Sequence, residues 1–140
     1  MNFNELTENQ TILRAVHALG FTEPSQIQSE SIPKIQAGGD VLAQSQTGTG
    51  KTVAYAIPAI ENIDNNDKRV QVLVVCPTRE LAVQVTDEFR KLLRFSDNIS
   101  AVTLYGGENI GNQIRKKRTQ MCCFPWTLAL SSISISTSLF

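Results

Sequence analysis

The chain has 140 residues, of which 41% are apolar and 19% are charged, a composition that excludes a disordered, collagen-like or coiled-coil protein. Thirteen basic and thirteen acidic residues cancel, so no overall charge marks the chain as a binder of nucleic acid or membranes. Three cysteines and one histidine exclude a disulfide framework and a Cys/His zinc site. With no signal-peptide pattern visible at the N-terminus, these features predict a cytoplasmic protein.

Two helices are predicted before residue 40, each with a capping-box sequence at its start. Residues 7–10 have the T-x-x-Q form of such a box, and residues 25–28 repeat it as S-x-x-Q. Apolar residues follow the first box at helical spacing: Ile12, Val16 and Leu19. In the second helix, Pro33 predicts a local kink because it has no N–H to donate and its ring crowds the preceding turn.

Strands and helices are then predicted to alternate. Residues 41–43 form a short apolar run that indicates a buried strand, and residues 52–63 have the pattern of a helix. Residues 70–76 are almost all apolar, which predicts a strand covered on both faces. Thr78 is placed to cap the helix that follows, and residues 100–105 alternate as a further strand does. This order predicts an α/β fold with a parallel sheet.

A glycine-rich loop lies between the strand predicted at 41–43 and the helix that follows it. Its residues are Ser45, Gln46, Thr47, Gly48, Thr49, Gly50, Lys51 and Thr52. Glycines let backbone N–H groups approach a phosphate chain without a Cβ in the way, and the helix N-terminus adds positive potential. Lys51 supplies a charge for β- and γ-phosphates, and Thr52 supplies a hydroxyl for Mg²⁺. The alternative is a plain glycine-rich turn, and many classes of nucleotide hydrolase share the motif.

Three further segments narrow the class. They are G-F-T-E-P-S-Q-I-Q at residues 20–28, P-T-R-E-L-A-V-Q at residues 77–84 and Y-G-G at residues 105–107. In this order around the loop, they make residues 3–117 resemble the first half of the first RecA-like domain of the DEAD-box RNA helicases. The resemblance implies a P-loop NTPase fold with a RecA-like parallel sheet flanked by helices, incomplete in this chain. It also implies ATP, Mg²⁺ and RNA as ligands.

The resemblance assigns the adenine base to Gln28 and Phe3. By this assignment Gln28 reads the adenine edge, which suits a carboxamide because it both donates and accepts hydrogen bonds. Phe3 matches an isolated upstream aromatic residue that packs on the base. The alternatives are a helix cap for Gln28 and a loosely held terminal hydrophobe for Phe3.

The same resemblance implies that residues after two of the predicted strands hold the RNA backbone: Pro77, Thr78, Arg79, Gly106 and Gly107. Open α/β sheets bind ligands at the carboxyl ends of their strands. Contacts from helix N–H groups and an arginine to phosphates predict binding that tolerates any sequence and weakens with salt. The alternative for Arg79 is an ion pair with Glu80. The basic run at residues 115–118 could extend the RNA track, although a solvated helix end is favoured.

The resemblance ends near residue 118. All charged residues lie within residues 1–118, and none lies in residues 119–140. In the family another strand, T-P-G-R and D-E-A-D follow, and none of them is expected here. We therefore expect a partial N-terminal RecA-like helicase domain at residues 1–118 and a non-family Ser/Ile/Leu-rich tail at residues 119–140, the kind of break that a change of reading frame or splicing produces. No membrane span is expected, because nine of the 22 tail residues are Ser, Thr or Gln.

The missing segments carry expectations about activity. Glu108 is the last acid of the chain, so no acid follows a later strand to hold Mg²⁺ and position water. We expect these residues to bind ATP and RNA with negligible hydrolysis or unwinding. The alternatives are a non-catalytic module that binds RNA or protein, and a non-functional remnant. The strand at residues 70–76 is expected to lack a neighbour on one side, because only part of a larger sheet is left.

Overall fold

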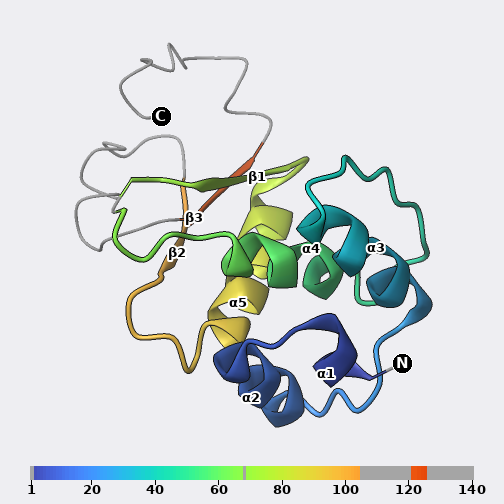
Figure 1. Ribbon diagram of the computed structural model, residues 1–140. Helices are drawn as coiled ribbons and strands as arrows, with labels where there is room; N and C mark the ends of the chain where they lie inside the picture. Colours follow the sequence, from blue (N-terminus) through green and yellow to red (C-terminus); the bar gives the residue numbers. More distant parts are fainter. Residues whose placement is uncertain (1, 68, 105–120, 126–140) are drawn as a thin grey trace. The chain divides into compact units, whose positions relative to one another are not determined.

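The computed structural model describes residues 2–67, 69–104 and 121–125 (Figure 1). Within these ranges the helices and strands are, in chain order, α1 (Phe3–Leu6), α2 (Gln10–Ala18), α3 (Gln26–Gln36), α4 (Lys51–Glu61), β1 (Val72–Cys76), α5 (Arg79–Leu92), β2 (Ala101–Thr103) and β3 (Met121–Pro125). They fall into two compact units, which are described separately. The helical unit comprises residues 1–62 and 91–96, and the sheet unit comprises residues 63–90 and 97–140.

Helix α2 begins at a cap different from the predicted one. The Asn9 side chain accepts hydrogen bonds from the backbone N–H groups of Thr11 at 3.0 Å and Ile12 at 3.3 Å. Thr7 instead donates from Oγ1 to a carboxylate oxygen of Glu61, at the end of α4. The predicted T-x-x-Q box is therefore wrong. Asn9 is an equally good cap and lies closer to the helix, while Thr7 has a partner that is distant in the sequence.

Helices α3 and α4 pack on each other and carry much of the core of the helical unit. The second capping box is confirmed, with Ser25 as the cap of α3 and Gln28 at its third position. Pro33 lies inside α3 and Pro58 inside α4. Large apolar side chains that are almost fully buried in this unit include those of Phe3, Ile12, Val16, Ile32, Val53 and Ile57. In the described ranges, no helix has the length and apolarity needed to cross a membrane.

Residues 41–43 do not form the buried strand that the sequence predicts. The segment from residue 39 to 46 has no regular secondary structure, and the Leu42 side chain is fully exposed. A strand exists only where a neighbour satisfies its backbone N–H and C=O groups. These three apolar residues have no such neighbour in the part of the chain that is described.

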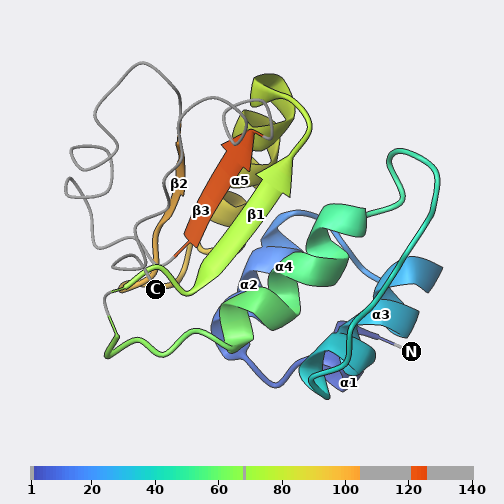
Figure 2. The same cartoon turned by 90° about the horizontal axis from the view of Figure 1, so that it is seen from above.

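The sheet unit contains three parallel strands in the order β1-β3-β2. Val74 of β1 pairs with Cys123 of β3, and Cys123 pairs on its other side with Thr103 of β2. The parallel sheet is thus confirmed. Among the described strands, β1 lies at one edge of the sheet. Figure 2 shows α5 along one side of the three strands.

Within the described residues of the sheet unit, strand β1 is covered on one face rather than on both. Its side chains alternate along the strand, and Leu73 and Val75 are 46% and 49% exposed whereas Cys76 is buried. The prediction of two covered faces is wrong. An apolar run shows that each side chain favours burial, but it does not show how many layers of structure cover the strand.

Strand β3 was not expected, and it is the central strand of the sheet. It bonds to β1 on one side and to β2 on the other. The expectation that the family's strand after Lys117 is missing is therefore wrong. The signal was present as the apolar run at residues 121–124, bounded by Gln120 and Pro125, which is typical of a strand even without any family motif.

Polar groups inside the sheet unit are paired with each other. The Thr103 hydroxyl donates to the Thr86 hydroxyl at 2.7 Å, and Thr86 donates to the carbonyl of Ala82 at 2.8 Å. These two hydrogen bonds join β2 to α5 and give both buried hydroxyls a partner. Burial raises the pKa of the Cys76 and Cys123 thiols, so both stay protonated and unreactive at neutral pH.

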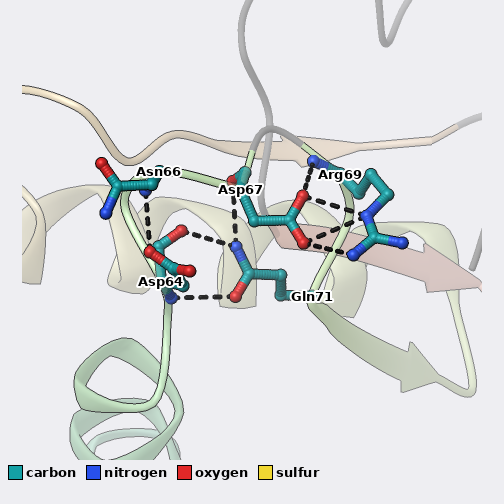
Figure 3. Close-up of polar contacts among 5 residues, drawn as sticks. All are labelled: Asp64, Asn66, Asp67, Arg69 and Gln71. Atoms are coloured by element: carbon teal, nitrogen blue, oxygen red, sulfur yellow. Dashed lines mark hydrogen bonds and ion pairs between the residues drawn. The ribbon is translucent and has the colours of Figure 1, made fainter.

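The loop before β1 is held together by its own side chains (Figure 3). The Gln71 amide accepts from the N–H of Asp64 at 2.9 Å and donates to the carbonyls of Asp64 and Asp67. Asp64 in turn accepts from the N–H of Asn66 at 2.9 Å. The carboxylate of Asp67 accepts from the guanidinium and from the N–H of Arg69.

The contact between Asp67 and Arg69 makes a prediction about pH. Hydrogen bonds from Arg69 lower the pKa of Asp67 from 3.8 to about 2. Because the folded loop lowers the pKa of Asp67, the contact stabilises this loop fully at pH values above 3.8. The stabilisation is lost as the pH falls through about 2, where the carboxylate is protonated. We expect a carbon NMR titration of the Asp67 carboxyl to have its midpoint near 2, and near 3.8 in Arg69→Gln. Arg90→Gln is the control and should leave the midpoint unchanged, whereas a wild-type midpoint at the ordinary value would contradict the contact.

Candidate functional site

The glycine-rich loop runs from Ser45 to Gly50 in the helical unit and leads directly into α4 (Figure 1). Gly48 and Gly50 have φ angles of +79° and +80°, in the left-handed region that a residue with a side chain rarely adopts. Gly50 is also the N-cap of α4. The unpaired N–H groups of the first turn therefore begin where the loop ends, as in a site for an anion.

The ammonium group of Lys51 is held against the loop. Its Nζ donates to the carbonyl oxygen of Ser45 and, at 2.7 Å, to that of Gln46. The Thr49 hydroxyl donates to the same Gln46 carbonyl at 2.9 Å and lies 2.6 Å from Ser45 Oγ. Thr52 follows in the first turn of α4 and is half-buried. The structure therefore brings the Lys51 charge together with the hydroxyls of Ser45 and Thr49.

Two side chains from the start of α3 hold the end of the loop. Ser25 Oγ donates to the carbonyl of Thr49 at 2.8 Å, and Gln28 Nε2 donates to the carbonyl of Gly50 at 3.1 Å. The same Gln28 caps α3, because its Oε1 accepts from the Ser25 N–H at 2.9 Å. We call Ser25 and Gln28 the loop clamp. Sequence reasoning missed the contact of Ser25 with the loop, since S-x-x-Q predicts only the cap.

The two residues predicted to contact adenine lie in different surroundings. Gln28 is 2% exposed and lies at the loop, and the alternative reading of it as a helix cap is confirmed as well. Phe3 is also 2% exposed, and its ring centroid lies 6.5 Å from that of Phe21. Phe3 is therefore a core residue rather than a loosely held terminal hydrophobe. Contact of either side chain with a base stays a prediction.

A cavity of about 430 Å³ lies beside the loop, between α3 and the irregular segment at residues 41–45. Ser25, Ser45 and Thr49 border it, so it is next to both the clamp and the loop. Its volume is in the range of small-molecule pockets. Gln28 is not among the residues that line it. The cavity therefore does not connect the predicted adenine contact with the loop.

The residues predicted to hold RNA lie in the sheet unit. Pro77 and Thr78 connect β1 to α5, and Arg79 is the first residue of that helix and is exposed. The predicted cap is confirmed, since Thr78 Oγ1 accepts from the N–H of Leu81 at 3.2 Å. Gly106 and Gly107 lie outside the described residues, as does the basic run at residues 115–118.

A glycine-rich loop that surrounds a lysine ammonium and begins a helix is the arrangement of a P-loop, so the site defines a P-loop protein. The family model of the DEAD/DEAH box helicases matches residues 25–129, and the chain belongs to this family. The match extends past residue 118 and includes strand β3.

Curated relatives and solved structures agree with this assignment. The chain is 43% identical over 130 residues to the DEAD-box ATP-dependent RNA helicase RhpA of Helicobacter pylori strain B128, covering 91% of this chain and 26% of that protein. It is 45% identical over 115 residues to the ATP-dependent RNA helicase DeaD of Haemophilus influenzae, covering 82% of this chain and 19% of that protein. The chain thus spans about a fifth to a quarter of the length of these relatives.

The crystal structure of a DEAD box protein from the hyperthermophile Methanococcus jannaschii matches with a TM-score of 0.80 and 38% identity, covering 89% of this chain and 34% of that one. S. cerevisiae Dbp5, in a variant bound to RNA and ADP BeF3, matches with a TM-score of 0.74 and 24% identity, covering 89% of this chain and 32% of that one. The second likeness shows the fold alone. Together they identify the fold as that of RecA-like domains of DEAD-box proteins, of which this chain is an incomplete part.

Proposed function

We propose that these residues are the ATP-binding and RNA-binding portion of an ATP-dependent RNA helicase. The observation that carries the proposal is the loop clamp. Ser25 and Gln28 lie in the segment that resembles the adenine-reading motif, and both donate to carbonyls of the phosphate loop. A nucleotide whose base contacts that segment would have its phosphates close to Lys51. The relatives' own description as ATP-dependent RNA helicases supports the same reading.

Adenine recognition by Gln28 is compatible with the bonds that its amide already makes. Nε2 donates one hydrogen to Gly50 and has a second, while Oε1 accepts one hydrogen bond and has a second lone pair. A carboxamide with one donor and one acceptor left can pair with the N6 and N7 edge of adenine. Guanine presents O6 at that edge in place of the amino group, so the proposal favours ATP over GTP. Phe3 is proposed as the aromatic contact of the same base.

Mg²⁺ would be held at the start of α4. Thr52 brings a hydroxyl oxygen to the first turn, and no group of three or more His, Cys, Asp or Glu side chains suited to a metal occurs among the described residues. This donor set fits a cation that binds mostly through phosphate oxygens and water, as Mg²⁺ does. When bound with ATP, the ion would neutralise charge between the β- and γ-phosphates. Lys51 and the loop N–H groups would orient the same phosphates.

RNA is proposed to contact Pro77, Thr78, Arg79, Gly106 and Gly107. The Thr78 oxygen accepts from Leu81, which leaves its hydroxyl hydrogen to donate to a phosphate. Arg79 adds a fork of donors at the helix start, where the positive end of the helix also attracts anions. Such contacts fix the position of a strand without reading its sequence.

Hydrolysis is not proposed for these residues alone. Within residues 1–140 no acid follows Glu108, so these residues by themselves offer no carboxylate after β3 to hold the metal and position water. This observation favours a second candidate function, a non-catalytic module that binds RNA or protein. A cytoplasmic location is proposed with either function, supported by the free thiols of Cys76 and Cys123.

The test of the adenine site is the ratio of ATP to GTP affinity, measured by competition against a fluorescent nucleotide. The wild-type chain should prefer ATP by about tenfold or more, because a bidentate contact of an amide with adenine discriminates by about 1–3 kcal/mol. Gln28→Ala should reduce this preference to near unity, whatever it does to overall affinity. Gln26→Ala is the matched control, since Gln26 is on the same helix and pairs only with Glu30 at 2.9 Å. Equal wild-type affinity for ATP and GTP would refute the assignment.

A further inference from the structure

Two arginines pack against one phenylalanine on the surface of the helical unit. The guanidinium carbon of Arg14, on α2, lies 4.5 Å from the ring centroid of Phe95, and that of Arg94 lies 5.6 Å from it. Arg94 and Phe95 come directly after the end of α5, and Phe95 is half-buried whereas both arginines are exposed. We call Arg14, Arg94 and Phe95 the arginine cluster. Stacking on a ring orients a guanidinium and leaves its N–H edge able to bind another group.

Among the described residues, no ion pair joins either arginine of the cluster to a carboxylate. Arg69 and Arg90, by contrast, pair with Asp67 and Asp87. Because both guanidiniums approach one ring, they lie within about 10 Å of each other. This is about one screening length at physiological salt, so the two charges reinforce each other toward an anion.

The planar fork of a guanidinium matches the oxygens of a phosphate, which it can bind in pairs. Phosphates of one strand follow each other at about 3.4 Å along a duplex axis, so two guanidiniums this close can reach the same stretch of backbone. An acidic peptide would satisfy the charges as well, and a labelled polyglutamate peptide distinguishes it from RNA.

We propose that the arginine cluster is an additional contact for the RNA backbone, distinct in sequence from the contacts proposed at residues 77–79. The inference rests on the proposed function, because it requires the chain to bind RNA. The cluster lies in the helical unit and residues 77–79 lie in the sheet unit, so each contact is proposed by itself.

The experiment measures binding of the whole chain to a fluorescein-labelled polyuridine of about 16 nucleotides by fluorescence anisotropy, at several salt concentrations. The variant Arg14→Gln with Arg94→Gln should bind roughly tenfold or more weakly at about 0.1 M salt. Its plot of log affinity against log salt should be flatter by about 1.4, which corresponds to two lost phosphate contacts on a single strand. Lys34→Gln with Arg69→Gln removes two other exposed charges and should bind as the wild type does. The variant Arg14→Lys with Arg94→Lys keeps the charges without the guanidinium forks. Its affinity for RNA should lie between those of the wild type and the glutamine pair.

Three results would overturn the inference, and they have different meanings. If the glutamine pair matches the control pair while Arg79→Gln weakens binding, the proposed function stands and the cluster is not part of it. If the wild-type chain binds no RNA, the RNA-binding part of the proposed function fails together with the inference. If the glutamine pair leaves RNA binding unchanged but abolishes binding of a labelled polyglutamate peptide, the cluster binds an acidic partner instead. Equal melting temperatures of the variants establish that a loss of affinity is not a loss of folding.

Discussion

Replacing Lys51 with alanine is expected to lower the affinity for ATP by about 10- to 150-fold. The Lys51 ammonium lies against the loop, bonded to the carbonyls of Ser45 and Gln46, where it can donate to a phosphate with little rearrangement. A hydrogen bond to a charged group contributes about 1.5–3 kcal/mol, which gives the range of the expected loss. The measurement is equilibrium binding of ATP by titration calorimetry or by a fluorescent analogue, with Mg²⁺ present.

The control for this prediction is Lys34→Ala, which removes an exposed lysine from the last turn of α3. It should bind ATP as the wild type does, because α3 contacts the loop through Ser25 and Gln28 and not through Lys34. Undiminished affinity in Lys51→Ala would contradict the nucleotide site. ATP turnover by the wild-type chain that disappears in Lys51→Ala would contradict the proposal of binding without hydrolysis.

Features set by neighbouring residues could be predicted from the sequence. The loop is an example, since glycines at positive φ and a lysine at the helix start are needed wherever the backbone must surround phosphates. The caps at Ser25 and Thr78 are others, because a side chain reaches only two or three residues along the backbone. The parts of the site that are made by residues close together in the sequence were therefore predicted. The contact of Ser25 with Thr49 joins segments 24 residues apart and left no such signal.

Features set by distant partners could not be predicted in the same way. Residues 41–43 are apolar enough for a strand, yet a strand needs a neighbour, and the sequence does not state which neighbour is available. The apolar run of β1 likewise predicted two covered faces. The exposed side chains of Leu73 and Val75 show that, within the described residues, only one face is covered. Strand β3 was missed for a different reason. Its apolar run carries none of the family's motifs, and only the pairing with β1 and β2 distinguishes it from any other short apolar segment.

Replacing Gly50 with alanine is expected to destabilise the helical unit by about 3–4 kcal/mol. Gly50 has a φ of +80°, which costs a residue with a Cβ about 1–2 kcal/mol. A Cβ there would also collide with the amide nitrogen of Gln28, a side chain that is only 2% exposed and has little room to move. Expelling it would break its hydrogen bonds to Ser25 and Gly50, at about 1 kcal/mol each. The total change in the free energy of unfolding is measured by urea unfolding followed by circular dichroism.

Two comparisons separate the strain from the collision. Gly38 also has a φ of +80°, but a Cβ there meets nothing within 4 Å, so Gly38→Ala should cost only the backbone strain of about 1–2 kcal/mol. Gln28→Ala should cost the clamp's hydrogen bonds in the wild-type background and almost nothing in Gly50→Ala, because that variant has already lost them. The double-mutant cycle should therefore give a coupling energy of about 0.5–3 kcal/mol. Strictly additive costs would mean that Gln28 does not hold the loop at Gly50, and the link between the adenine-reading segment and the phosphate loop would lose its structural support.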